Sequence, residues 1–129
     1  MQEGVSRRRL LIVEDNDDTA HVLKWGLEQL GYQVEIAHNG PLALQVAVGF
    51  KPDVAVLDLG LPVMDGWELA RRLRGQKADL QVIAVTGYAE DAARVRSADA
   101  GFADHLLKPV DIDAIHAAVQ RLPDGAPSP

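Results

Sequence analysis

Five short apolar runs recur along the chain, and polar residues, glycine or proline bound them. The runs are 10–13, 34–37, 54–57, 82–85 and 105–107, of which the second is interrupted by Glu35. Short runs bounded in this way are typical of β-strands. In the first, third and fourth runs the apolar residues are continuous rather than alternating. This pattern favours strands of a parallel sheet that is covered on both faces.

Segments with helical spacing separate these runs. Leu23 and Leu27 are four residues apart, as are Leu69 and Leu73, with polar residues turned outward between them. Residues that commonly cap or end helices flank the segments: Asn16 to Asp18, Gly31, Asn39, Asp65 and Asp111. The alternation of strand and helix predicts a doubly wound α/β domain of the (βα)5 type, with a five-stranded parallel sheet between two layers of helices.

Length and composition limit the organisation of the chain. Its 129 residues fit one domain, which we place at 9–122 after an N-terminal extension, 1–8. Residues 123–129 are rich in proline and predict a disordered tail or the stub of a linker. The absence of cysteine excludes disulfides and Cys-ligated zinc. The sequence also lacks a signal peptide and an apolar run long enough to span a bilayer, so we expect a cytoplasmic protein that does not contact a membrane.

The charge balance bears on the partners. Nineteen acidic residues outnumber thirteen basic ones, for a formal net charge of −6. Non-specific binding to a phosphate backbone depends on clustered Lys and Arg. The composition therefore argues against direct binding of nucleic acid.

Polar residues follow four of the five apolar runs. Glu14 and Asp15 follow the first run, Asp58 the third, Thr86 the fourth and Lys108 the fifth. Each has an ordinary explanation when taken alone, because an aspartate after a strand is commonly a helix cap and a lysine is commonly on the surface. Right-handed crossovers, however, bring the carboxyl ends of all parallel strands to one edge of the sheet. We therefore expect the five side chains to converge there.

The residue types at this edge suit phosphoryl transfer. Three carboxylates held together repel one another and favour a cation, and oxygen ligands without His or Cys suit Mg²⁺ or Mn²⁺. Lys108 and Thr86 add an ammonium and a hydroxyl group around an incoming anion. Asp58 then remains as a nucleophile that could form an acyl phosphate.

The motifs LLIVEDN, VAVLDLGLPVMDG, IAVTG and LLKP occur in this order over nearly the whole chain. With them the sequence resembles the receiver domain of two-component response regulators. The resemblance implies a strand order of 2-1-3-4-5, Asp58 as the phosphoacceptor, and metal binding by Glu14, Asp15, Asp58 and the backbone carbonyl of Gly60. It also implies that Thr86 and Lys108 contact the phosphoryl group. A cis bond between Lys108 and Pro109 is implied as well.

Three positions depart from the usual family pattern. Glu14 stands where Asp is more usual, so its longer side chain could reach the ion through water. His105 stands where Tyr or Phe usually turns inward together with the hydroxyl residue; a conformational switch and a partly exposed strand-end histidine are equally compatible with it. Gly60 and Tyr88 follow Asp58 and Thr86 by two residues, and they suggest slow loss of the phosphoryl group.

The resemblance implies a switch that receives its phosphoryl group from a histidine kinase or a histidine phosphotransfer protein. Phosphorylation would change the surface from the fourth to the fifth helix, about 89–122, which would control a protein effector, an attached domain or a second copy of the chain. Alternatives are a Mg²⁺-dependent phosphohydrolase of the haloacid dehalogenase type, a flavin-binding protein and a scaffold that needs no phosphate. Such hydrolases carry a second acid two residues after the nucleophile, but here that position is Gly60. The acidic loop EDNDD disfavours binding of a flavin phosphate.

Overall fold

The fold is a single parallel sheet between two layers of helices. The computed structural model describes residues 8–61, 63–87 and 100–122. Its elements are β1 (Arg9–Val13), α1 (Asp17–Gln29), β2 (Gln33–Ala37), α2 (Gly40–Phe50), β3 (Val54–Asp58), α3 (Gly66–Gln76), β4 (Gln81–Thr86), β5 (Asp104–Leu107) and α5 (Ile112–Gln120). All five predicted strands are present, and each extends one or two residues beyond its apolar run. The fourth predicted helix falls within 88–99, outside the described residues.

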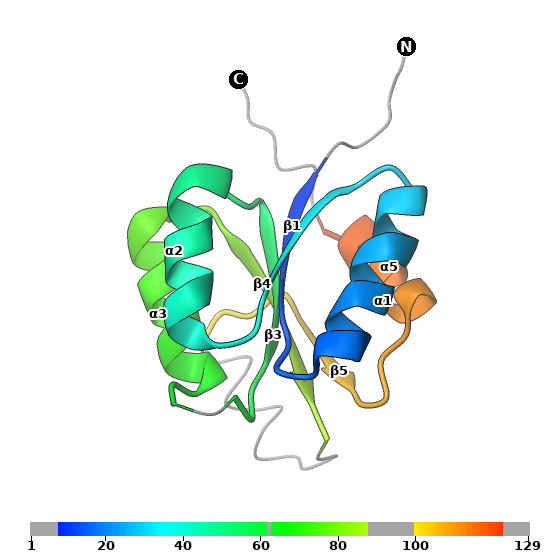
Figure 1. Cartoon of the computed structure of the whole chain (residues 1–129). Helices are drawn as coiled ribbons and strands as arrows, with labels where there is room; N and C mark the ends of the chain where they lie inside the picture. The colour runs from blue at the N-terminus through cyan, green and yellow to red at the C-terminus, as the bar shows by residue number, and fades with distance from the viewer. Residues whose placement is uncertain (1–7, 62, 88–99, 123–129) are drawn as a thin grey trace.

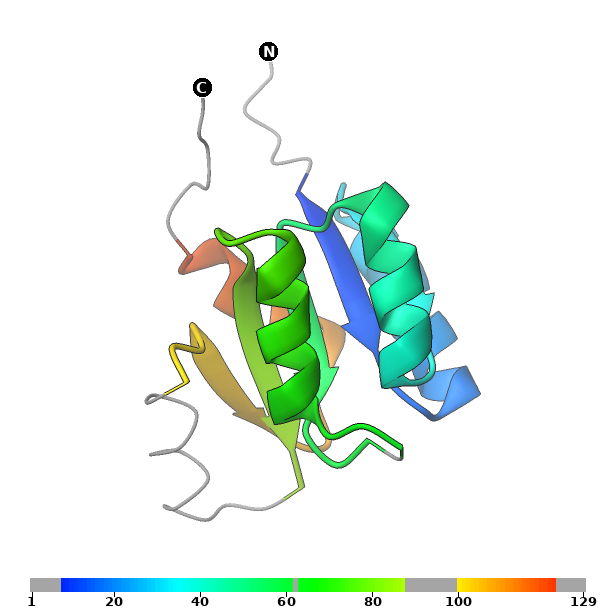
Figure 2. The same cartoon turned by 90° about the vertical axis from the view of Figure 1, so that its left-hand side faces the viewer.

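The strand order is β2-β1-β3-β4-β5, and all four strand pairs are parallel. Helices α1 and α5 cover one face of the sheet, whereas α2 and α3 cover the other (Figure 1). Figure 2 shows the second face, with α2 and α3 side by side in front of the strands. The predicted fold class and strand order are confirmed.

Two apolar cores lie on opposite faces of this sheet. Side chains of β1 alternate between them: Leu10 and Ile12 pack on the side of α1 and α5, whereas Leu11 and Val13 pack on the side of α2 and α3. All four are at most 1% exposed. Successive strand residues point to opposite faces, so a strand with helices on both sides needs a continuous apolar run. This explains the pattern from which the parallel sheet was predicted.

The helices begin where the sequence places capping residues. Each cap side chain accepts a hydrogen bond from the backbone N–H three residues ahead: Asn16 from Thr19 at 2.9 Å, Asn39 from Leu42 at 2.8 Å, Asp65 from Glu68 at 2.9 Å and Asp111 from Ala114 at 2.8 Å. Gly31 follows α1 with a φ of 101°, a left-handed conformation that glycine adopts without a steric cost. The predicted helix boundaries are therefore confirmed at these positions.

The start of β1 is tied to the end of α5. The Arg8 guanidinium donates hydrogen bonds to the carbonyl oxygens of Val119, at 3.1 Å, and of Leu122, at 3.4 Å. Both carbonyls lie at or just beyond the carboxyl end of α5, where the helix dipole favours a cation. The two ends of the described chain thus lie at the amino edge of the sheet, away from the carboxyl ends of the strands (Figure 1). Across the described ranges, no helix has the length and apolar character needed to cross a bilayer.

Candidate functional site

The polar residues predicted to converge do lie at the carboxyl edge of the sheet. Asp58 and Thr86 are the last residues of β3 and β4. The backbone N–H of Glu14 donates to Ala37 at 3.0 Å, and that of Lys108 donates to the carbonyl of Thr86 at 2.8 Å. These bonds continue the hydrogen-bond ladder by one residue beyond β1 and β5. The backbone of the site is therefore held by the sheet itself.

Three carboxylates form a compact acidic cluster at this edge. Glu14, Asp15 and Asp58 each offer an oxygen atom, and these atoms lie within 4.8 Å of one another. Asp58 and Glu14 are only 6% and 8% exposed, whereas Asp15 faces solvent. Three oxygen ligands of which two are shielded from water suit a hard divalent cation such as Mg²⁺ or Mn²⁺. The donor set fits the metal expected from the sequence, while the identity of the ion stays a prediction.

Both oxygens of the Asp58 carboxylate have a donor. The backbone N–H of Gly60 donates to Oδ1 at 2.9 Å, and the Lys108 ammonium donates to Oδ2 at 2.5 Å. Burial alone would lower the pKa of Lys108, but the hydrogen bond and charge of Asp58, with the charges of Glu14 and Asp15, outweigh it and raise that pKa. Lys108 is therefore a permanent cation beside the cluster at neutral pH.

Glu14 is the member of the cluster whose ionisation is disfavoured. Burial raises the pKa of its carboxyl group, and a hydrogen bond with Asp15 and the charge of Asp58 act in the same direction. The Asn16 N–H, which donates to Oε2 at 3.0 Å, and the charge of Lys108 lower the pKa but do not cancel the rise. Without a bound cation, ionised Glu14 therefore destabilises the fold.

The raised pKa of Glu14 predicts that Glu14→Gln stabilises the metal-free protein at pH 7. The raised pKa means that the folded state binds a proton more tightly than the unfolded chain does. The penalty is thus complete above that pKa and disappears as the pH falls through it. We expect a gain of about 1 kcal/mol in the free energy of unfolding, within the range that single stabilising substitutions commonly give. Urea unfolding with a chelator, at pH 7 and at acidic pH, measures it.

Glu35→Gln is the matched control for this prediction, because Glu35 is an exposed glutamate in β2 outside the cluster. Its effect should be close to zero at either pH. A Glu14→Gln protein that is less stable than the parent at pH 7 would contradict the argument.

Thr86 and His105 lie on the neighbouring strands β4 and β5, and the roles of Thr86, Gly60 and His105 stay predictions. Thr86 is 5% exposed and ends β4 next to the strand of Asp58. His105 is half-buried in β5, at the register position opposite Ala84. The bond between Lys108 and Pro109 is cis, as the resemblance implied. Tyr88 lies outside the described residues, and so does part of the surface 89–122.

Some neighbours of the site could not be found from the sequence. The N–H groups of Gly60 and Asn16 are backbone donors, and no residue type signals them. His38 was also missed, although its Nδ1 lies 3.4 Å from the carbonyl oxygen of Glu14.

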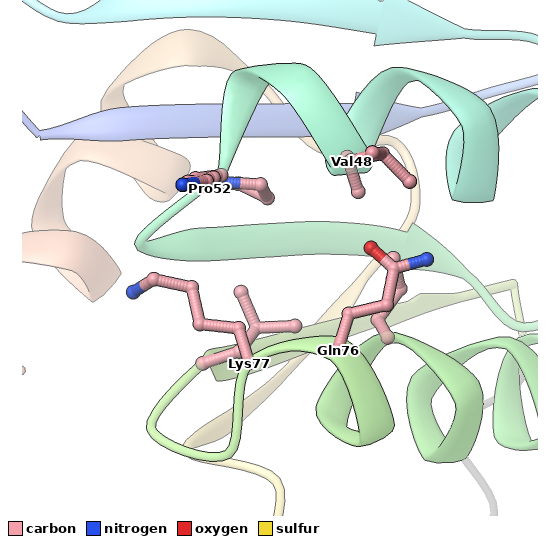
Figure 3. Close-up of a pocket in the computed structure, with 8 residues that line it drawn as sticks. Val48, Pro52, Gln76 and Lys77 are labelled. Carbon is pink, nitrogen blue, oxygen red and sulfur yellow. The ribbon is translucent and has the colours of Figure 1, made fainter.

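A hollow of about 510 Å³ lies elsewhere, between the carboxyl ends of α2 and α3 (Figure 3). Apolar side chains such as Leu73 and Leu80 line it, together with Lys51, Gln76 and Lys77. The Lys77 ammonium lies 3.2 Å from Asp79 and 3.5 Å from Asp53, at the amino edge of the sheet. No residue of the acidic cluster lines this hollow, so it is separate from the candidate site.

Comparisons with known proteins agree with the geometry. The family model for the response regulator receiver domain matches residues 10–120. Response regulator MprA of Mycobacterium tuberculosis H37Rv is 37% identical over 114 residues, which are 88% of this chain and 50% of MprA. Regulatory protein AtoC of Escherichia coli K12 is 34% identical over 113 residues, 88% of this chain and 24% of AtoC. The chain thus spans about half the length of MprA and less of AtoC.

Solved structures show the same arrangement. Chemotaxis protein CheY4 of Vibrio cholerae superposes with a TM-score of 0.83 at 25% identity, covering 90% of this chain and 98% of CheY4. A response regulator from Burkholderia pseudomallei was solved with a phosphorylated aspartic acid, a calcium ion and citrate. It superposes with a TM-score of 0.80 at 34% identity, over 88% of this chain and 67% of the Burkholderia chain. With the family model spanning nearly all of its described elements, this chain belongs to the response regulator receiver domain family.

Proposed function

We propose that this chain is a phosphorylation-activated switch in which Asp58 accepts a phosphoryl group from a phosphohistidine. The observation that supports this most directly is the environment of the Asp58 carboxylate, which lies between the Lys108 ammonium and the carboxylates of Glu14 and Asp15. A membership in the receiver family is consistent with two-component signalling. The phosphorylated aspartic acid of the Burkholderia pseudomallei relative supports the same chemistry.

The acceptor step is an in-line displacement at phosphorus. An Asp58 oxygen forms the new P–O bond, and the P–N bond to the donor imidazole breaks, so that the imidazole leaves with the electron pair and takes up a proton. Gly60 holds the other Asp58 oxygen through its N–H and so orients the carboxylate. The Lys108 ammonium contacts Asp58 in the unmodified protein. After transfer it would stabilise the negative charge on the phosphoryl oxygens.

A divalent cation fits the same site. Glu14, Asp15 and Asp58, with the backbone carbonyl of Gly60, would hold it, and Mg²⁺ is the ion that we propose. When bound, the cation neutralises charge on the phosphoryl oxygens. The longer side chain of Glu14 already accepts a hydrogen bond from Asn16, which fixes one of its oxygens toward the first turn of α1.

The phosphorylated state then changes a surface for partners. We propose that the Thr86 hydroxyl donates to the new phosphoryl group and that His105, on the neighbouring strand, responds to this movement. A histidine kinase or phosphotransfer protein would supply the phosphoryl group. An effector protein, an attached domain or a second copy of this chain would read the change. Slow loss of the phosphoryl group remains our prediction from Gly60, which has no side chain to orient water.

Acetyl phosphate with Mg²⁺ tests the proposal directly. We expect intact-mass measurement to show one added phosphoryl group, formed without a kinase, because the chain's own residues position and neutralise the group. Steady release of inorganic phosphate without an adduct would instead support the phosphohydrolase alternative. If neither an adduct nor phosphate release occurs, the chain's own residues do not carry out the acceptor step and the proposal is wrong.

A further inference from the structure

The hollow between the carboxyl ends of α2 and α3 has the size and the lining of a small-molecule site (Figure 3). Its volume of about 510 Å³ lies within the range of about 300–1,000 Å³ that is usual for such sites. Three of its lining residues, Ala47, Leu73 and Leu80, are at most 5% exposed and belong to the same apolar core. Because this part of the lining is already packed, a ligand could enter without rearranging it.

Two polar contacts connect the α3 side of the hollow to the α2 side. The Gln76 side-chain amide donates to the carbonyl oxygen of Leu44, on α2, at 3.3 Å. The Lys77 ammonium, directly after α3, lies 3.5 Å from Asp53, directly before β3. Figure 3 shows Gln76 and Lys77 on the α3 side, with Val48 of α2 opposite them. These contacts favour a hollow that is formed before a ligand binds.

The apolar lining reaches the surface on α2. Val48 lines the hollow and is 64% exposed. No residue of α2, from Gly40 to Phe50, carries a charge, although helices at a protein surface usually have charged residues on their outward face. The α2 side of the hollow therefore favours an apolar occupant.

Lys51 gives the same hollow a positive charge. It directly follows α2, three residues after Val48. Its ammonium makes no hydrogen bond or ion pair with the other residues that the structure describes, 8–61, 63–87 and 100–122. The other lining lysine, Lys77, is already paired with Asp53 and Asp79, and neither of these carboxylates lines the hollow. Lys51 is therefore placed to pair with an anionic group of an occupant.

The backbone of Lys51 is a second, independent observation. Its φ of 53° and ψ of 65° are left-handed, a conformation that ends many helices but in which glycine is the usual residue. A residue with a Cβ atom adopts this conformation at a steric cost. Glycine at this position would favour folding more than lysine does. A strained residue with an unpaired ammonium beside a hollow is consistent with a binding role.

We propose that the hollow binds a small amphipathic carboxylate, an anion whose apolar body is about the size of a medium-chain fatty acid. The apolar body would contact Val48, Leu73 and Leu80, and the carboxylate would pair with Lys51. The acidic cluster at the opposite edge of the sheet shares no residue with this site. Binding therefore does not depend on phosphoryl acceptance by Asp58.

NMR titration of the unphosphorylated full chain with decanoate tests the site. At about pH 7 this probe is a carboxylate anion. We expect saturable binding of one molecule, with the amide signals of Val48, Lys51 and Lys77 shifting together. Decyltrimethylammonium has an apolar chain of the same length but a positive charge. It should shift these signals with an affinity at least about threefold lower, because Lys51 repels it.

Lys51→Gly separates binding from folding. The variant should bind decanoate about three- to fivefold more weakly, the effect of one partly exposed ion pair. Its midpoint of urea unfolding should nevertheless rise, because glycine relieves the strained helix end. A purely structural role of Lys51 does not predict these opposite effects.

Val48→Glu places a carboxylate at the hollow and should weaken decanoate binding by at least about tenfold, since it replaces an apolar contact with a like charge. Leu42→Glu is the matched control, because Leu42 is an exposed residue of the same helix that does not line the hollow. Its binding should equal that of the parent. The proposal is wrong if decanoate binding does not saturate, or if Lys51→Gly and Val48→Glu bind as the parent does. It is also wrong if the chain is a dimer that Val48→Glu dissociates and decanoate does not, since a second copy then covers the hollow.

Discussion

Asp58→Asn is expected to abolish phosphoryl acceptance completely. The amide is nearly the same size as the carboxylate and can still accept the hydrogen bond from the Gly60 N–H. It has no negative charge, however, and an amide oxygen is a far weaker nucleophile toward phosphorus. The substitution also removes the charged partner of Lys108, which lies 2.5 Å away. The protein should therefore fold normally and remain unmodified by acetyl phosphate and Mg²⁺.

Intact mass after a fixed incubation measures this result, and circular dichroism confirms that the variant is folded. Asp53→Asn is the matched control, because Asp53 also pairs with a lysine, Lys77 at 3.5 Å, but at the opposite edge of the sheet. It should accept one phosphoryl group as the parent does. An adduct of equal yield in Asp58→Asn would place the acceptor at another residue and overturn the assignment.

Local sequence patterns were sufficient for the fold class because each of them has a local physical cause, whereas the strand order was implied by the family resemblance. Apolar runs mark strands that helices cover on both faces, and Asn39 or Asp65 mark helix starts because their side chains satisfy N–H groups a few residues ahead. The exact strand ends were harder to predict. Asp58 and Thr86 proved to be the last residues of their strands rather than the first residues after them. Backbone pairing does not depend on the side chain, so a strand can extend past the end of its apolar run.

The candidate site could also be predicted only in part from the sequence. Convergence of the polar strand ends follows from parallel topology, and the structure brings Glu14, Asp15 and Asp58 together. The direct contact between Lys108 and Asp58 spans 50 residues of sequence, and no local pattern specifies which oxygen the ammonium reaches. The 3.1 Å contact between His38 and Asp17 has the same origin, since it depends on how the loop after β2 approaches α1.

A close approach of two backbone segments also supports the site, and it depends on Gly66. This glycine is the first residue of α3 and follows the cap residue Asp65. A Cβ atom at this position would lie 2.9 Å from the Cα atom of Leu59 and 3.0 Å from the carbonyl oxygen of Asp58. Both of these are backbone atoms of the phosphoacceptor segment, so they cannot move aside as a flexible side chain can. The start of α3 or the segment after Asp58 must shift instead.

Gly66→Ala is therefore expected to lower the free energy of unfolding by about 1–3 kcal/mol, the usual cost of overpacking. Because the displaced backbone includes Asp58, we also expect slower phosphoryl acceptance from acetyl phosphate. Gly75→Ala, in the same helix, is the matched control: nothing lies within 4 Å of its Cβ position, and alanine should stabilise the helix by up to about 1 kcal/mol. Urea unfolding of both variants measures the difference. If the two substitutions have the same sign and size, helix propensity rather than the contact with Leu59 and Asp58 governs position 66.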